Sequence, residues 1–224
     1  MVKVMPEILV QYQAEIWQSI EETFIMVGVS LLFAIFLGLP LGTLLFLTRK
    51  GQLMENRIVF SILNLFVNIV RSFPFLLFVV FLIPFTRWLI GTAIGTAAAT
   101  VPLSIMAVAY YSRLVEQSLV DVPKGVIEAA VSMGASIREI IFKFLLVEAR
   151  SGLVLGLTTS TISFISYSTI VGVVGGGGIG DFAIRYGYQQ FETELMMYMI
   201  IIMIILVQAI QFTGTTISKV IDKR

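Results

Sequence analysis

Five long stretches of this chain contain almost no charged side chain, and this feature limits its fold more than any other. They cover residues 23–48, 58–86, 88–112, 151–180 and 195–218, and Arg71 is the only charge within them. A helix needs about 20 residues to cross a bilayer, and a charge at that depth costs about 2.5–3.5 kcal/mol. The pattern predicts an all-α polytopic bundle of about five transmembrane helices. Residues 58–86 could alternatively form two half-spans broken at residues 71–74, which would give six crossings.

The composition excludes several other classes of protein. The chain is 58% hydrophobic and 13% charged, whereas soluble domains average about 45–50% and 25%. A chain of 224 residues cannot bury such an excess in its own core. The net charge of +1 gives no basic field for nucleic acid. Since cysteine and histidine are absent from the sequence, we expect no thiol chemistry, no metal site and no cofactor.

The distribution of lysine and arginine predicts the orientation in the membrane. With five spans, 11 of these residues fall in segments 49–57, 113–150 and 219–224, and three fall in segments 1–22, 87 and 181–194. Positive charge accumulates on the cytoplasmic side of membrane proteins. We therefore expect the N-terminus outside, the C-terminus in the cytoplasm, and one transmembrane domain over residues 1–224 with a cytoplasmic loop at 113–150. Six crossings would place one of the basic clusters on the wrong side.

The sequence of the 113–150 loop indicates two short helices. Asp121 is a candidate N-cap, Pro123 suits a first turn, and Gly134 is a stop signal. Ser136 and Glu139 then have the spacing of a capping box.

Small side chains on the first of these helices predict a surface into which another protein could dock. The candidate contact residues are Glu128, Ala129, Ala130, Ser132 and Gly134. The alternative is an amphipathic helix that lies on the bilayer and contacts no protein.

Three pairs of glycines at i, i+4 are expected to allow close helix packing within the spans. They are Gly38 and Gly42, Gly91 and Gly95, and Gly152 and Gly156.

The loop also resembles a known family. Residues 128–134, Glu-Ala-Ala-Val-Ser-Met-Gly, followed by Leu145 and Leu146, are similar to the EAA loop of ABC importer permeases, although Val147 stands where that family usually has proline. Segments 38–52, 68–75, 83–103 and 172–191 resemble the permease subunit of methionine-type importers. This resemblance implies a type I ABC importer permease in the inner membrane of a bacterium.

The resemblance also implies partners and a substrate. The loop would form a coupling helix that docks on an ABC ATPase subunit, present in two copies. A second copy of the chain would complete a homodimer, an extracytoplasmic substrate-binding protein would deliver the ligand, and membrane lipid would surround the spans. The implied substrate is methionine, including D-methionine or a related small amino acid.

The residues are consistent with a subunit that performs no chemistry. The sequence contains no G-x-x-x-x-G-K-[ST] motif to hold a nucleotide triphosphate. A pump of this kind needs an ATPase partner or an ion gradient. The five spans contain no Asp, Glu or His, which ion-coupled carriers usually place there. An ion-coupled secondary amino-acid transporter with sodium sites built from backbone carbonyls stays the alternative.

Two groups of polar residues are candidates for the pathway and gate. In the second span, Asn64, Asn68 and Arg71 share one helix face, which must contact protein or water. This face is either a hydrogen-bonded helix interface or a pathway lining that captures a substrate carboxylate.

The fourth span carries the other group of candidates. Ser166, Tyr167 and Thr169 either bond to their own helix or line the pathway. Ile170 is a candidate apolar constriction.

Overall fold

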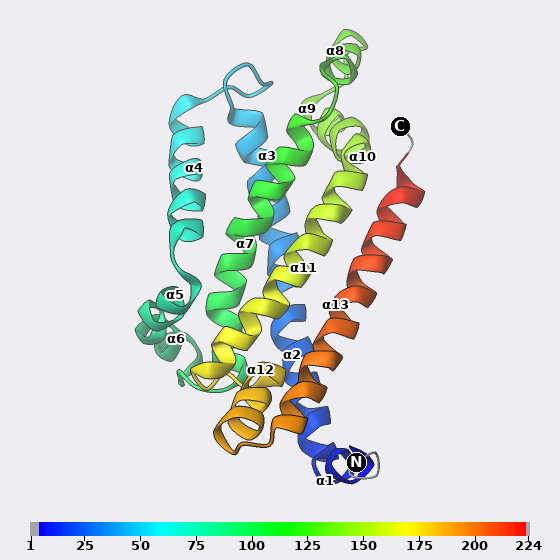
Figure 1. Cartoon of the computed structure of the whole chain (residues 1–224). Coiled ribbons are helices and arrows are strands. Elements are labelled where there is room, and N and C mark those ends of the chain that lie inside the picture. Colours follow the sequence, from blue (N-terminus) through cyan, green and yellow to red (C-terminus); the bar gives the residue numbers. More distant parts are fainter. Residues whose placement is uncertain (1–4, 223–224) are drawn as a thin grey trace. The chain divides into compact units, whose positions relative to one another are not determined.

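The computed structural model describes residues 5–222, and every element within that range is a helix (Figure 1). Lys3, Lys223 and Arg224, which entered the charge count, lie outside the described residues. The α-helical elements and the π-helical segments η1 to η3 are α1 (Met5–Gln11), α2 (Gln13–Phe33), η1 (Ala34–Gly38), α3 (Leu39–Thr48), α4 (Arg57–Ser72), α5 (Phe75–Phe81), α6 (Ile83–Ile90), α7 (Thr96–Val120), α8 (Lys124–Ser132), α9 (Ile137–Glu139), η2 (Ile140–Leu145), α10 (Leu146–Glu148), α11 (Arg150–Val173), α12 (Gly178–Phe182), η3 (Ala183–Gln189) and α13 (Thr193–Ile221).

Four helical stretches are long and apolar enough to cross a membrane: Gln13–Thr48, Thr96–Val120, Arg150–Val173 and Thr193–Ile221. Helices α4 and α5 pass the same test only together, as a bent pair, which gives up to five spans. The predicted all-α fold is confirmed. The second span is broken at Phe73 and Pro74, within the segment where the half-span alternative placed a break. Proline disfavours the helical conformation of the residue before it, which explains this position.

The chain divides into two compact units, which are described separately. The first unit contains the residues up to Leu31, Phe73–Ile105 and Thr161–Ile210, and the second contains Leu32–Ser72, Met106–Ser160 and the residues from Gln211. The boundaries fall inside α2, α7, α11 and α13 and in the break after α4. The single domain expected over residues 1–224 stays a prediction.

The core of the first unit joins α2, α12 and α13. Ile16, Ile179, Phe182, Leu195 and Met199 are buried together in one apolar cluster. Aromatic packing extends this cluster, because the ring centres of Phe182 and Tyr186 lie 4.7 Å apart. The cluster fixes the short helix α12 to its two longer neighbours.

In the second unit, two of the predicted glycine pairs pack against α7. A Cβ atom on Gly42 would overlap the carbonyl oxygen of Ser112, and one on Gly152 would lie 2.9 Å from a serine oxygen of α7. Gly38 and Gly156 also face α7 at close range. These two predictions are confirmed.

The third glycine pair does not pack between helices. Gly91 and Gly95 have φ angles of 86° and 96° and lie in the connection between α6 and α7. Such left-handed backbone ends a helix and is readily adopted by glycine. The prediction for this pair is therefore wrong, and the third span begins at Thr96 instead of residue 88.

Candidate functional site

The predicted loop begins later than expected, because α7 continues through Arg113 to Val120. Helix α8 starts at Lys124, and its N-cap is Pro123, with φ −57° and ψ 128°. Asp121 lies before the cap and forms no part of it, so that prediction is wrong. The residue before proline avoids helical backbone, so a new helix can begin only at or after Pro123.

The end of α8 and the start of α9 agree with the sequence prediction. Gly134 has a φ of 77°, and the next amide, of Ala135, donates to the carbonyl of Ala130 at 3.1 Å. The Ser136 amide donates to the Glu139 carboxylate at 3.1 Å, and the serine oxygen accepts from the Glu139 amide. The predicted stop and capping box are confirmed, and together they fix the angle between the two helices.

The carboxyl group of Glu139 is strongly biased toward its ionised form. Hydrogen bonding from Lys143, at 2.9 Å, and from the Ser136 amide lowers the pKa of Glu139 to about 2. The side chain itself is exposed, so this pair orders the start of α9 without being part of a core.

Most of the predicted ATPase-contact residues lie on the surface. Figure 1 shows α8 projecting beyond the ends of α7 and α11. Four of the five candidates are exposed: Glu128, Ala129, Ser132 and Gly134. The prediction did not include Val131 and Met133, whose exposed fractions are 50% and 68%. Apolar side chains this exposed on a projecting helix are typical of a contact surface.

Ala130 differs from the other four, because its side chain is fully buried. It lies where α8 packs against η2, whose residues Ile140 and Leu145 are also buried. Its role is therefore to seat α8 on this chain, and it has no side-chain surface to offer a partner.

The candidates on α4 form a polar cluster with α7 in the second unit. One guanidinium nitrogen of Arg113 donates to the side-chain oxygens of Asn64 and Asn68, each at 2.7 Å. The other nitrogen forms an ion pair with Glu116, and the side chains of Arg113 and Glu116 are 15% and 5% exposed. This geometry favours the helix-interface alternative for both asparagines. Sequence reasoning missed Arg113 because its partners are 45 and 49 residues away.

Arg71 does not join this cluster. It is exposed at the end of α4, and its guanidinium carbon lies 5.7 Å from the centre of the Tyr110 ring. This is a cation–π arrangement. A role for Arg71 in capturing substrate stays a prediction.

The candidates on α11 lie in the first unit. The ring of Tyr167 stacks on Phe75 of α5 at 4.6 Å. Thr169 donates to the carbonyl of Ser166 at 2.7 Å, and Ser166 donates within its own helix at 3.4 Å. Ile170 is half-buried. The hydroxyls of Ser166 and Thr169 are thus bonded within α11. A gate at these four residues stays a prediction.

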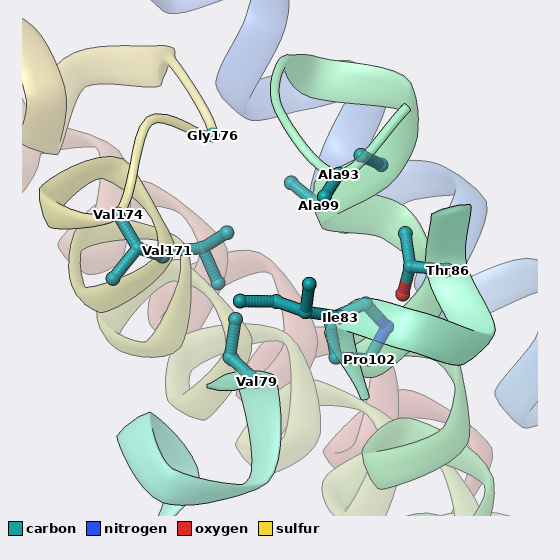
Figure 2. Close-up of a pocket in the computed structure, with 10 residues that line it drawn as sticks. Val79, Ile83, Thr86, Ala93, Ala99, Pro102, Val171, Val174 and Gly176 are labelled. Carbon is teal, nitrogen blue, oxygen red and sulfur yellow. The ribbon is translucent and has the colours of Figure 1, made fainter. Parts of the chain in front are cut away.

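A small apolar cavity lies beside this part of α11. Its volume is about 20 Å³, and Figure 2 shows Val79, Ile83 and Val171 pointing toward one another around it. Ala99 and Pro102 of α7 also line it. A space of this size holds about one water molecule. The side chains around it thus leave no room for a solute here.

The glycine-rich segment before α12 is tied to α2, which sequence reasoning did not predict. The Glu22 carboxylate accepts a hydrogen bond from the Gly178 amide at 2.7 Å, and the Thr23 oxygen accepts from the Ile179 amide at 2.9 Å. The pKa of the neighbouring Asp181 is raised above its ordinary value. The main cause is burial, and the Glu22 carboxylate adds to it, while Arg185 acts in the opposite direction. The glycine-rich residues 175–178 are therefore anchored to α2 at their C-terminal end.

Comparison with known proteins agrees with this architecture. Residues 34–224 match the family described as "Binding-protein-dependent transport system inner membrane component". The chain is 41% identical over 213 residues to the probable D-methionine transport system permease protein MetI of Pasteurella multocida, covering 93% of this chain and 98% of that protein. It is 44% identical over 210 residues to the methionine import system permease protein MetP of Bacillus subtilis, covering 94% and 95%.

A solved structure is also similar over almost the whole chain. A chain of the MetNI methionine ABC transporter in an inward-facing conformation matches with a TM-score of 0.89 and 40% identity, covering 99% of both chains. The chain therefore belongs to the family of binding-protein-dependent transport system inner membrane components, and within it to the multi-pass MetI/MetP permeases.

Proposed function

We propose that this chain is the translocation subunit of an ATP-driven methionine importer and is coupled through α8 to a separate ATPase. The observation that carries the proposal is its 41–44% identity, over more than nine-tenths of its length, to permeases named for methionine transport. The substrate includes D-methionine, which is named for one of these relatives.

The exposed face of α8 supports the proposed contact with the ATPase. Small residues leave room for a partner, and Val131 and Met133 provide apolar surface. An exposed apolar patch on a short helix fits a groove on another protein. Two copies of the ATPase follow if two copies of this chain assemble, because each chain carries one such helix.

A continuous backbone in the second unit can transmit movement from α8 into the membrane. The amide of Ala149 donates to Leu145, and the amide of Leu153 donates to Ala149, both at 2.9 Å. Helical bonding thus continues from η2 into α11. When ATP draws the two ATPase subunits together, each α8 moves with its ATPase, and α11 follows as a lever. The transporter would then alternate between its inward-facing and outward-facing states.

Five spans are few to enclose a pathway, so a second copy of the chain would form the other wall. An external substrate-binding protein would deliver methionine to the outer side. The chain itself would bind and guide the substrate, and ATP hydrolysis would take place in the partner.

Co-purification tests the coupling surface. Ala129→Arg adds a long charged side chain to the exposed face of α8. We expect this variant to enter the membrane normally but to lose the ATPase on purification. Val220→Arg adds the same side chain at a position of α13 that is 78% exposed, and it serves as the matched control. An ATPase that stays bound to the Ala129→Arg variant would contradict the proposed surface.

Uptake of labelled methionine tests the substrate and the energy source. Cells with the chain should accumulate methionine, unlabelled D-methionine should compete, and the Ala129→Arg variant should show background uptake. Uptake by the chain alone in vesicles with an ion gradient would support the secondary-carrier alternative instead.

A further inference from the structure

The second unit contains a pocket of about 490 Å³ that the proposed transport function does not use. It lies between the end of α3, the start of α4 and the C-terminal part of α7. Its charged lining residues are Arg49, Lys50, Arg57, Arg113 and Glu116. Four cations thus surround one acid.

The single acid of the lining is already neutralised. Glu116 forms an ion pair with Arg113, whose remaining hydrogen bonds go to the amides of α4. This pair lines the pocket but contributes almost no net charge to it.

The positive charge of the pocket comes from the other three cations. Arg57 lies 3.8 Å from Glu55, but both side chains are exposed, at 76% and 41%. Such a pair contributes little and is screened by water. Within residues 5–222, Arg49 and Lys50 have no acidic side chain at ion-pair distance. The pocket is therefore a concave surface with unbalanced positive charge, which attracts an anion.

The surface beside the pocket is apolar and exposed. Leu44 on α3 and Ile58 and Ile62 on α4 are 43%, 73% and 62% exposed. Charged residues therefore adjoin apolar helix faces that have the character of lipid-facing surface. This arrangement fits a ligand with an anionic head and apolar chains.

We propose that this basic pocket, formed by Arg49, Lys50 and Arg57 above the Arg113–Glu116 pair, binds the phosphate of an anionic phospholipid. Arginine binds phosphate oxygens through two parallel hydrogen bonds, and basic pockets between membrane helices bind acidic headgroups. The acyl chains would lie along the exposed faces of α3 and α4. The site would order the connection at residues 49–56 between these helices.

Native mass spectrometry of the purified full-length chain tests the proposal. The probes are phosphatidylglycerol, phosphatidylcholine and inorganic phosphate. Ser61 lines the pocket and is exposed, so Ser61→Phe fills the pocket without a change of charge. We expect phosphatidylglycerol to bind the native chain more tightly than phosphatidylcholine, and Ser61→Phe to weaken this binding about tenfold. Ile217→Phe, at a position of α13 that is 53% exposed and does not line the pocket, is the matched control and should bind as the native chain does.

A pair of charge variants tests the same site independently of packing. Arg49→Gln with Lys50→Gln should weaken phosphatidylglycerol binding by about fivefold for each lost charge. Arg138→Gln with Lys219→Gln removes the same charge elsewhere and should leave binding unchanged.

Three results would overturn the proposal. One is equal binding of the two phospholipids, and another is equal weakening by both charge variants, since each would indicate only general attraction to the surface. The third is binding of inorganic phosphate that Ser61→Phe abolishes while phosphatidylglycerol binding stays unchanged. That result would assign the pocket to a free anion.

Discussion

At the scale of single residues, the ion pair of Arg113 with Glu116 should contribute strongly to folding, because both side chains are largely buried on α7. Arg113→Met would leave the buried Glu116 carboxylate without its cation, which costs about 3–5 kcal/mol in folding free energy. Adding Glu116→Leu removes the orphaned charge, so the double variant should recover most of that loss. Thermal unfolding of the purified chain measures both, with Lys219→Met as an exposed-charge control. A double variant as unstable as Arg113→Met alone would show that the pair is not the cause.

Asn64 allows the two interpretations of the α4 polar face to be separated. In the interface interpretation, Asn64→Leu removes one acceptor of Arg113, at 2.7 Å in the native structure. Stability should then fall by about 1.5–3 kcal/mol, the range for hydrogen bonds to charged groups. Uptake per folded molecule should stay near the native rate. Normal stability with abolished uptake would instead place Asn64 in the pathway.

The Glu139 carboxylate predicts a pH dependence for the coupling segment. Its pKa is lowered to about 2 from an ordinary 4.5, so the hydrogen bonds favour folding above the ordinary value. This contribution is lost as the pH falls through about 4.5 toward 2. The melting-temperature difference between the native chain and Glu139→Ala should therefore shrink as the pH falls through this range. A difference that grows or stays constant there would contradict the cause given for the shift.

At the scale of elements, the bonds of Glu22 and Thr23 to the start of α12 should control the order of the glycine-rich segment. Glu22→Ala removes a charge-assisted hydrogen bond to the Gly178 amide. Such bonds contribute about 1.5–3 kcal/mol, so hydrogen exchange at residues 178–180 should accelerate by about ten- to a hundredfold. Glu21→Ala, at the exposed neighbouring position, should leave this exchange unchanged. Equal exchange in both variants would show that the carboxylate does not hold the segment.

The elements that sequence predicted are those governed by local rules. The membrane spans follow from the cost of placing charge in lipid. The capping box can be read from sequence because Ser136 and Glu139 stand three residues apart at the start of one helix. Gly91 and Gly95 misled because an i, i+4 spacing does not show whether the backbone is helical. Their positive φ angles depend on the turn between α6 and α7.

The candidate site was predicted only where its chemistry is local. Gly134 ends α8 by its own backbone freedom, and the small side chains of α8 can be read directly from the sequence. The Arg113 cluster and the Glu22 contact join segments far apart in the chain, and the pairing depends on how helices pack. Ala130 could not be predicted for the same reason. Its burial depends on the packing of α8 against η2, which the amphipathic pattern of α8 alone does not reveal.

At the scale of the whole molecule, the proposed second copy has a direct test. Helix α13 is apolar, and little of it is buried within the chain. With α11, α12 and η3 it forms an apolar groove of about 410 Å³ in the first unit. We expect native mass spectrometry of the purified importer to show two copies of this chain with two ATPase subunits. A stable, active assembly with one copy would contradict the proposed dimer.

The absence of cysteine from the sequence makes the orientation testable with single introduced thiols. Met54, between α3 and α4, and Gln190, before α13, are both exposed. The excess of lysine and arginine predicts position 54 on the cytoplasmic side and position 190 outside. In intact cells, a membrane-impermeant thiol reagent should therefore label Gln190→Cys but label Met54→Cys only after the membrane is opened. In the five-span topology an odd number of crossings separates positions 54 and 190. Labelling of both positions from outside would therefore require an extra crossing between them. That result would replace the bent α4–α5 span with two separate crossings and would contradict the five-span topology.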